Sequence, residues 1–400
     1  MLKIFPFHSQ LRDYFKKQTK TWSWFSEQKV IQEHHETFKT DLLKNSYRID
    51  KESEPGLHVS LENAKNKLGI LLPVTVYQSQ NIGYNNAQIV YMGNEAHIIL
   101  SGSILKLLDE TEMTSLLAHE LSHILLFTLE NNEFEITQRI INTIANDHNS
   151  ELFYSETARL YNLYTELFCD LGSLLVCNDL EIVVNTLVKL HTGLEKVSAA
   201  SYLKQANEIL GRIEDGSSGD THPEIYIRAK SLELFHSREM DYFTKIEKMV
   251  NGQNDLNQLN LFSKVEVYNL TKTLVSIVLK PKWTNSEHCI VLYKQYFKEY
   301  DKISDAFIDE DFKNKINNSK DTLRNYYAYV MLDFALCDRE LLEPFAGHIL
   351  DIAEQLNLGD NVKIVIKKEL KLTEKSFKEF SQKSASALNS ILESEHENTY

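Results

Sequence analysis

Two histidines four residues apart, inside a strongly apolar stretch, constrain this chain more than any other feature. His119 and His123 flank Glu120 within residues 110–129, where leucine, isoleucine and alanine are frequent. Residues four apart share one face of an α-helix, so both imidazoles can bind one metal ion. Glu120 lies one step round the helix, within reach of a metal-bound water. Because apolar residues surround these polar groups on most sides, a surface helix with incidental histidines is disfavoured, and the pattern predicts a metal site.

A second apolar helix, expected over residues 155–177, carries two carboxylates four residues apart. Glu166 can complete a set of two histidines and one glutamate that leaves one position open for water. Asp170 can accept the remaining ring N–H of a ligand histidine, more naturally that of His119. The sequence therefore predicts one Zn2+ per chain, held by His119, His123 and Glu166, with Asp170 behind the ligands.

Cys169 lies between these two carboxylates in the sequence and is a rival metal ligand. Such a cysteine more commonly packs in the core as a small hydrophobic residue. Gly172 and Ser173 are also small, which would let the two metal-site helices approach closely.

A third motif marks the start of another helix. Thr221 and Glu224 fit a capping box, and Pro223 suits the first helical turn. His222 would then lie at a helix N-terminus, where an N–H donor can face the oxyanion that forms when water attacks a peptide carbonyl. Arg228, farther along the helix, could hold the third metal ligand or the oxyanion. Taken alone, a histidine in this position is more often a surface residue.

In their order along the chain, these motifs resemble the gluzincin zinc metallopeptidases, the family of the HtpX heat-shock protease and the CaaX prenyl protease. The resemblance extends from about residue 57 to residue 234. It rests on Leu68-Gly69-Ile70, Pro73-Val74-Thr75-Val76-Tyr77, Asn86-Ala87, the strand 96–101, His119 to His123, Glu166 to Asp170, and Thr221-His222-Pro223 with Arg228.

The resemblance implies a zinc-dependent endopeptidase and a role for each motif residue. Glu120 would be the general base, and His222, supported by Arg228, would donate to the oxyanion. The strand before the metal helix would serve as an edge on which extended substrate is laid. This expected edge strand consists of Ala96, His97, Ile98, Ile99 and Leu100. Two departures are Cys169, where the family usually has alanine, and the lack of the family's membrane helices, which favours a soluble member without a membrane-embedded or prenylated substrate.

The expected fold class is α+β, mostly α: a zincin-like metallopeptidase core with a small β-sheet, followed by a helical C-terminal region. Three runs suit strands, at 72–77, 87–92 and 96–101, and nearly everything after them has helical periodicity. We expect a helical N-terminal segment at 1–56, a metallopeptidase domain at 57–240, a helical domain at 241–381 and a disordered tail at 382–400.

Length, composition and net charge limit the classes of partner that the chain is expected to bind. With 400 residues, 42% hydrophobic and 25% charged, the chain is typical of a globular protein of more than one domain. A net charge of -14 argues against nucleic acid, and no apolar run reaches the length of about 20 residues that spans a membrane. Four cysteines without paired spacing and no apparent secretory signal suggest the cytoplasm. The expected partner is a protein or peptide substrate, with a possible protein partner or self-association through the C-terminal helices.

One alternative comes from another functional class: a catalytically quiet, zinc-stabilised scaffold or regulatory interaction protein. A helical interaction protein without metal is a third possibility, but it requires every motif to be coincidence. Glu120 and His222 favour the enzyme, because a structural zinc site needs neither residue.

Overall fold

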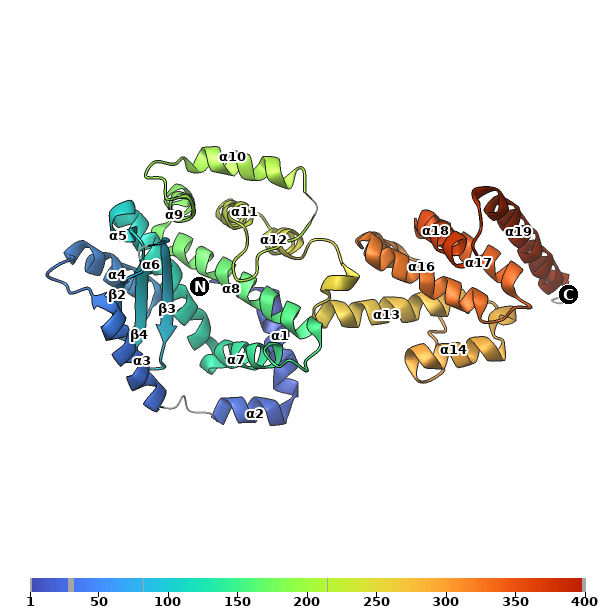
Figure 1. Cartoon of the computed structure of the whole chain (residues 1–400), viewed down its shortest axis with the longest axis horizontal. Helices are drawn as coiled ribbons and strands as arrows, with labels where there is room; N and C mark the ends of the chain where they lie inside the picture. The colour runs from blue at the N-terminus through green and yellow to red at the C-terminus, as the bar shows by residue number, and fades with distance from the viewer. Residues whose placement is uncertain (1, 28–31, 82, 214, 398–400) are drawn as a thin grey trace. The chain divides into compact units, whose positions relative to one another are not determined.

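The chain forms two compact units, Met1–Gly252 and Gln253–Tyr400. The computed structural model describes residues 2–27, 32–81, 83–213 and 215–397 (Figure 1). Helices dominate both units and the strands form one small mixed sheet, so the predicted α+β, mostly α class is confirmed. The second unit begins after α12 (Tyr242–Asn251), whereas the sequence suggested a boundary before that helix.

All strands found in the described residues belong to the first unit. Before α12, the helices and strands of this unit are, in chain order, α1 (Pro6–Lys17), α2 (Thr19–Glu27), α3 (Gln32–Asn45), β1 (Ser46–Arg48), α4 (Pro55–Leu68), β2 (Val74–Ser79), β3 (Asn86–Tyr91), β4 (Ala96–Ser101), α5 (Ile104–Leu107), α6 (Glu110–Thr128), α7 (Glu133–Ala145), α8 (Leu152–Cys177), α9 (Leu180–Thr192), α10 (Ala199–Leu210) and α11 (Ile225–His236).

The four-stranded sheet has the order β1-β2-β4-β3. Strand β4 pairs in parallel with β2, Val76 opposite Ile98, and antiparallel with β3, Ile89 opposite Ile98. The predicted edge role of Ala96–Leu100 is therefore wrong, since both sides of β4 are already paired. A strand with consecutive buried residues is typical of a sheet centre. Among the described residues β3 pairs with β4 alone, which makes β3 the edge strand on that side.

Helices α6 and α8 pack unusually closely beside the sheet. Gly172 of α8 makes this possible, because a Cβ at this position would lie 1.9 Å from Ser122 Oγ on α6. A capping box fixes the start of α6: Asp109 accepts from the backbone N of Glu112, whose carboxylate accepts from the N of Asp109. The close approach at Gly172 is the one that the sequence predicted from the small residues of α8.

The N-terminal segment belongs to the same core. Phe5, Leu11 and Phe15 are fully buried, and α1 packs on α7 and α8. His8 of α1 is also buried, and its Nε2 lies 3.1 Å from the hydroxyl of Thr165 on α8. Residues 1–56 therefore do not form a separate unit.

The second unit is helical and has its own hydrophobic core. Its helices are α13 (Leu261–Val278), α14 (Glu287–Phe297), α15 (Glu310–Asn317), α16 (Asp321–Leu336), α17 (Leu342–Gln355), α18 (Gly359–Glu369) and α19 (Glu374–Glu397). Helix α19 occupies most of the expected disordered tail. Its residues Ser384 and Leu388, one turn apart, are buried against Gly347 of α17. These contacts stabilise the helix, although the polar composition of the segment had indicated disorder. No helix in the described part of the chain is long and apolar enough to cross a membrane.

Candidate metal centre

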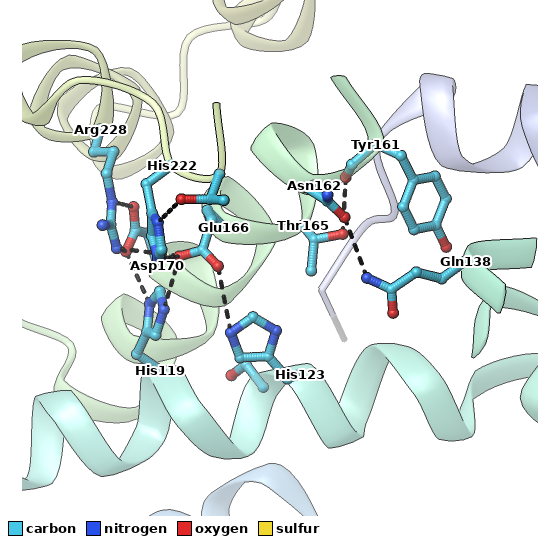
Figure 2. Close-up of polar contacts among 12 residues, drawn as sticks. His119, His123, Gln138, Tyr161, Asn162, Thr165, Glu166, Asp170, His222 and Arg228 are labelled. Carbon is cyan, nitrogen blue, oxygen red and sulfur yellow. Dashed lines mark hydrogen bonds and ion pairs between the residues drawn. The ribbon is translucent and has the colours of Figure 1, made fainter. Parts of the chain in front are cut away.

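Three elements bring the predicted site residues together (Figure 2). Helix α6 supplies His119, Glu120 and His123, and α8 supplies Glu166 and Asp170. The segment before α11 and that helix itself supply the remaining two, His222 and Arg228. The residues of β4 lie in the neighbouring sheet and do not line the site pocket.

The carboxylate of Glu166 faces both helix histidines. Its Oε2 lies 3.2 Å from His119 Nε2, and its Oε1 lies 3.6 Å from His123 Nε2. Ligand atoms about 2.05 Å from a tetrahedral metal are separated by about 3.3 Å, close to both distances. Oε2 is buried, yet no described group donates to it in hydrogen-bond geometry. A buried carboxylate oxygen without a donor, facing two imidazole nitrogens, fits a bound cation.

Asp170 orients the first histidine from behind. Its Oδ1 accepts from His119 Nδ1 at 3.0 Å, so that Nε2 carries the lone pair when the ring is neutral. Burial lowers the pKa of His119, but Asp170 and Glu166 outweigh burial and raise it to about 10, so a metal ion would displace a proton from Nε2. Arg228 binds this carboxylate through two nitrogens, at 2.8 and 2.7 Å. Burial raises the pKa of Asp170, but Arg228 and His119 outweigh burial and hold the pKa below its usual value. Arg228 thus acts mainly on Asp170, with its Nη2 still 3.8 Å from Glu166 Oε2, and the sequence did not predict the Asp170 contact.

Glu120 and His123 both have strongly shifted pKa values. Glu120 is only 5% exposed, and burial raises its pKa to about 7, assisted by the charge of Glu166 and opposed by the nearby cations. Burial lowers the pKa of His123 to about 4, so the ring is neutral at pH 7 and its lone pair is available. One group is therefore poised to exchange a proton near neutral pH, and the other to bind a cation.

His222 lies at the mouth of the site. Its Nε2 is 3.3 Å from Glu166 Oε2, its Nδ1 is 2.8 Å from Thr221 Oγ1, and its side chain is 54% exposed. The capping box predicted here is absent, because α11 begins at Ile225 and its N-cap Glu224 has no side-chain cap hydrogen bond.

The physical reason is that the Glu224 carboxylate is engaged elsewhere. It accepts hydrogen bonds from Ser217 and Ser218, at 2.7 and 2.8 Å. These bonds tie the preceding loop to the start of α11. His222 is therefore held by a folded loop and not by the first turn of a helix.

Cys169 also lies beside the histidines. Its Sγ and one ring nitrogen each of His119 and His123 lie within 4.8 Å of one another, so these three residues form a group that could hold a metal ion. Burial raises the pKa of the Cys169 thiol far above its usual value, and the carboxylates of Glu166 and Glu120 add to this effect. The neutral thiol is strongly favoured in these surroundings.

A pocket of about 610 Å³ opens beside the site. Its floor includes His119, Glu120 and Glu166, and its rim includes Asn86 and Ala87 of the edge strand β3. One wall is apolar and comes from α9, α10 and the start of α11. The wall residues are Val183, Leu187, Leu190, Tyr202, Ile225 and Tyr226. Sequence reasoning missed them, since apolar residues at helical spacing are assigned to a core by default.

Comparison with known proteins adds two similarities. Residues 31–149, which include the His119 to His123 motif, match the SprT-like family. Over 228 residues the chain is 26% identical to the plastoglobule-localized metallopeptidase 48, chloroplastic, of Arabidopsis thaliana. That alignment covers 52% of this chain and 65% of the plant protein, just under two thirds of its length. No solved structure matches. The similarities are to metallopeptidase-related proteins, and they do not single out the HtpX and CaaX prenyl protease branch.

Proposed function

We propose that this chain is a zinc-dependent endopeptidase. His119, His123 and Glu166 would hold the metal, and Glu120 would be the general base. The observation that carries the proposal is the Glu166 carboxylate, whose buried Oε2 has no donor in hydrogen-bond geometry. Its Oε2 faces His119 Nε2 and its Oε1 faces His123 Nε2, at distances close to those of a tetrahedral site. The similarity to a protein named a metallopeptidase supports the same class.

Each side chain has a definite task in this proposal. A bound zinc ion supplies a water of lowered pKa and polarises the substrate carbonyl. Glu120 takes the proton of the attacking water and returns it to the leaving amine, which suits a carboxylate whose pKa is raised to about 7. Asp170 fixes the ring of His119, and Arg228 keeps Asp170 ionised and in place.

His222 would donate to the oxyanion. When the Thr221 hydroxyl donates to Nδ1, the neutral ring carries its proton on Nε2, the atom 3.3 Å from Glu166. Burial lowers the pKa of His222, which favours this neutral form. A donor at the mouth of the site can reach a substrate carbonyl, whereas Arg228 is already bound to Asp170.

Glu166 is a better third ligand than Cys169. A thiol must lose its proton to bind zinc, and the carboxylates around Cys169 oppose that loss. Glu166 is already ionised, because the histidines and Arg228 outweigh burial and hold its pKa well below the usual value. Its placement between the two histidines requires no change of protonation.

The pocket indicates the kind of substrate. An extended peptide can add to the free side of β3, and Asn86 and Ala87 bring the start of that strand to the pocket. The apolar wall next to the metal site suits a large apolar side chain adjoining the scissile bond. We therefore propose unfolded polypeptide segments with such a residue as substrates.

The proposal is tested with the purified full-length chain and a reduced, alkylated polypeptide. We expect one zinc ion per chain, cleavage that a chelator abolishes and zinc restores, and cleavage sites enriched in large apolar residues. Glu166→Ala should lose the metal, and the matched variant Cys169→Ala should keep it. A chain that binds zinc through Glu166 but never cleaves would instead be a zinc-stabilised scaffold, and zinc lost only with Cys169→Ala would refute the ligand assignment.

A further inference from the structure

Two cysteines of the second unit lie next to each other, although 48 positions separate them in the sequence. Cys289 is in the first turns of α14, and Cys337 directly follows α16; their Sγ atoms are 3.2 Å apart. Both are free thiols. We propose that Cys289 and Cys337 are a redox modification site, which small disulfides of the glutathione type convert into a reversible intramolecular disulfide.

The geometry needs little adjustment. A disulfide bond is about 2.05 Å long, so the sulfur atoms must approach by about 1.2 Å. Both residues are held in place: the backbone N of Cys289 donates to Ser286 Oγ at 3.4 Å, and Cys337 Sγ lies 3.1 Å from the carbonyl O of Phe334. Bond formation would give up the weak contact of the Cys337 thiol with that carbonyl.

The two sulfurs differ in access and in acidity. Cys289 is fully buried, while Cys337 is partly exposed and can be reached by a small reagent. The neighbouring Cys337 thiol, with help from Ser286 and against burial, lowers the pKa of Cys289 to about 7. The helix N-terminus favours a thiolate at Cys289 as well. The same contact with Cys289, together with burial, raises the pKa of the Cys337 thiol far above its usual value. The arrangement gives an accessible sulfur for the first reaction, once it has passed its proton to Cys289, and a buried nucleophile for the second.

The exchange balances in two steps. Cys337 passes its proton to the Cys289 thiolate and attacks one sulfur of the small disulfide, which forms a mixed disulfide and releases one small thiolate. The released thiolate takes the proton back from Cys289. The Cys289 thiolate then attacks the Cys337 sulfur, breaks the mixed disulfide and releases the second small thiolate, which takes up a proton from solvent. Two protein thiols are oxidised, one small disulfide is reduced to two thiols, and the product ties the start of α14 to the end of α16.

The test treats the native full-length chain with glutathione disulfide and maps its peptides under non-reducing conditions. We expect a Cys289–Cys337 linked peptide in most molecules, lost again on treatment with dithiothreitol. Cys177→Ser, which removes another partly exposed thiol, should form the same link to the same extent.

The single variants report the order of the steps. Cys289→Ser should trap glutathione on Cys337, because the buried nucleophile is missing, and Cys337→Ser should give no link and little adduct. Two results would overturn the proposal. One is wild-type protein that carries glutathione on Cys337 without forming the linked peptide, and the other is protein in which both thiols remain free after treatment with glutathione disulfide. This measurement is independent of proteolysis and of bound metal.

Discussion

At the scale of single residues, each side chain of the site fixes the orientation of the next. Arg228 binds Asp170 through two nitrogens, Asp170 accepts from His119 Nδ1, and His119 thereby presents Nε2 toward Glu166. The Asp170–His119 link is buried and the Arg228–Asp170 link is partly buried, so the loss of a partner is costly at either one. Asp170 and Arg228 thus control the nitrogen that we propose as a metal ligand, without being proposed ligands themselves.

Asp170→Asn tests whether these hydrogen bonds orient His119. An amide removes the charge that balances Arg228 and weakens the bond to His119, so zinc affinity should fall by roughly ten- to a hundredfold while the fold persists. Competition with a chromophoric chelator measures the affinity. Asp147→Asn, on an exposed turn after α7, is the matched control and should change nothing. Equal zinc affinity in wild type and Asp170→Asn would show that Asp170 does not orient the ligand.

Most of the site residues can be found in the sequence because helical spacing fixes their relative positions. His119 with His123, and Glu166 with Asp170, each share a helix face once the helix is predicted. The binding of Arg228 to Asp170 depends on tertiary packing and is therefore not visible in spacing. The capping box failed because Glu224 has competing partners in the preceding loop, Ser217 and Ser218.

At the scale of elements, the contact between α6 and α8 sets the distance between the ligand pairs. Gly172 faces Ser122 so closely that any side chain at this position must push the helices apart. Because the three proposed metal ligands lie on these two helices, the separation of the helices would set the geometry of a bound metal ion.

Gly172→Ala should therefore destabilise the protein by about 1 to 3 kcal/mol and weaken zinc binding. The added Cβ would lie 1.9 Å from Ser122 Oγ and 2.7 Å from Ser122 Cβ. Denaturant unfolding measures the loss, and Ser122→Gly in the same chain should restore part of it. Gly211→Ala, where the nearest described atom is 3.4 Å away, is the control. Equal stability of both alanine variants would rule out the close approach.

The docking of α1 on α8 should make stability depend on pH through His8. Burial lowers the pKa of His8 from 6.5 to about 3, against a backbone hydrogen bond with Tyr161. In the unfolded chain His8 binds a proton more readily than in the folded protein. The contribution of His8 to the free energy of unfolding is therefore complete above pH 6.5 and is lost as the pH falls toward 3. Between pH 7 and pH 5 the loss is about 2 kcal/mol.

His8→Gln removes the titrating group and can retain a hydrogen bond to Thr165. The difference in unfolding free energy between wild type and variant should therefore change by about 2 kcal/mol from pH 7 to pH 5. Urea unfolding at both pH values measures it. A difference independent of pH would mean that His8 is accessible to protons in the folded state.

The sheet illustrates the limit of prediction for elements. Runs rich in β-branched residues predicted β2, β3 and β4 because strand propensity and burial are local signals. Strand order depends on pairing between distant segments. Only the structure places β4 between two strands and leaves β3 at the edge.

At the scale of the whole molecule, the first unit contains every residue of the candidate site. Helix α12 completes that unit: Ile246 and Val250 are buried, and Asn251 accepts from the hydroxyl of Tyr164 on α8. Amphipathic helices on both sides of the boundary look alike in sequence, so the sequence placed α12 with the wrong neighbour.

A fragment of residues 1–252 should consequently bind one zinc ion as the full chain does. A fragment of residues 1–240 lacks α12 and exposes the surface that Ile246 and Val250 cover, so it should unfold at lower denaturant concentration. Metal content and urea unfolding of the two fragments provide the comparison. Equal stability of both fragments would show that α12 does not complete the first unit.

The most direct test of the peptidase assignment is the Glu120→Gln variant, with zinc content and cleavage of an unstructured polypeptide measured on the same preparation. Glutamine keeps the size of the side chain but cannot accept the proton of the attacking water. Zinc should remain at one ion per chain while the cleavage rate falls by about 10² to 10⁴-fold. Cleavage at the wild-type rate by zinc-loaded Glu120→Gln would contradict the account.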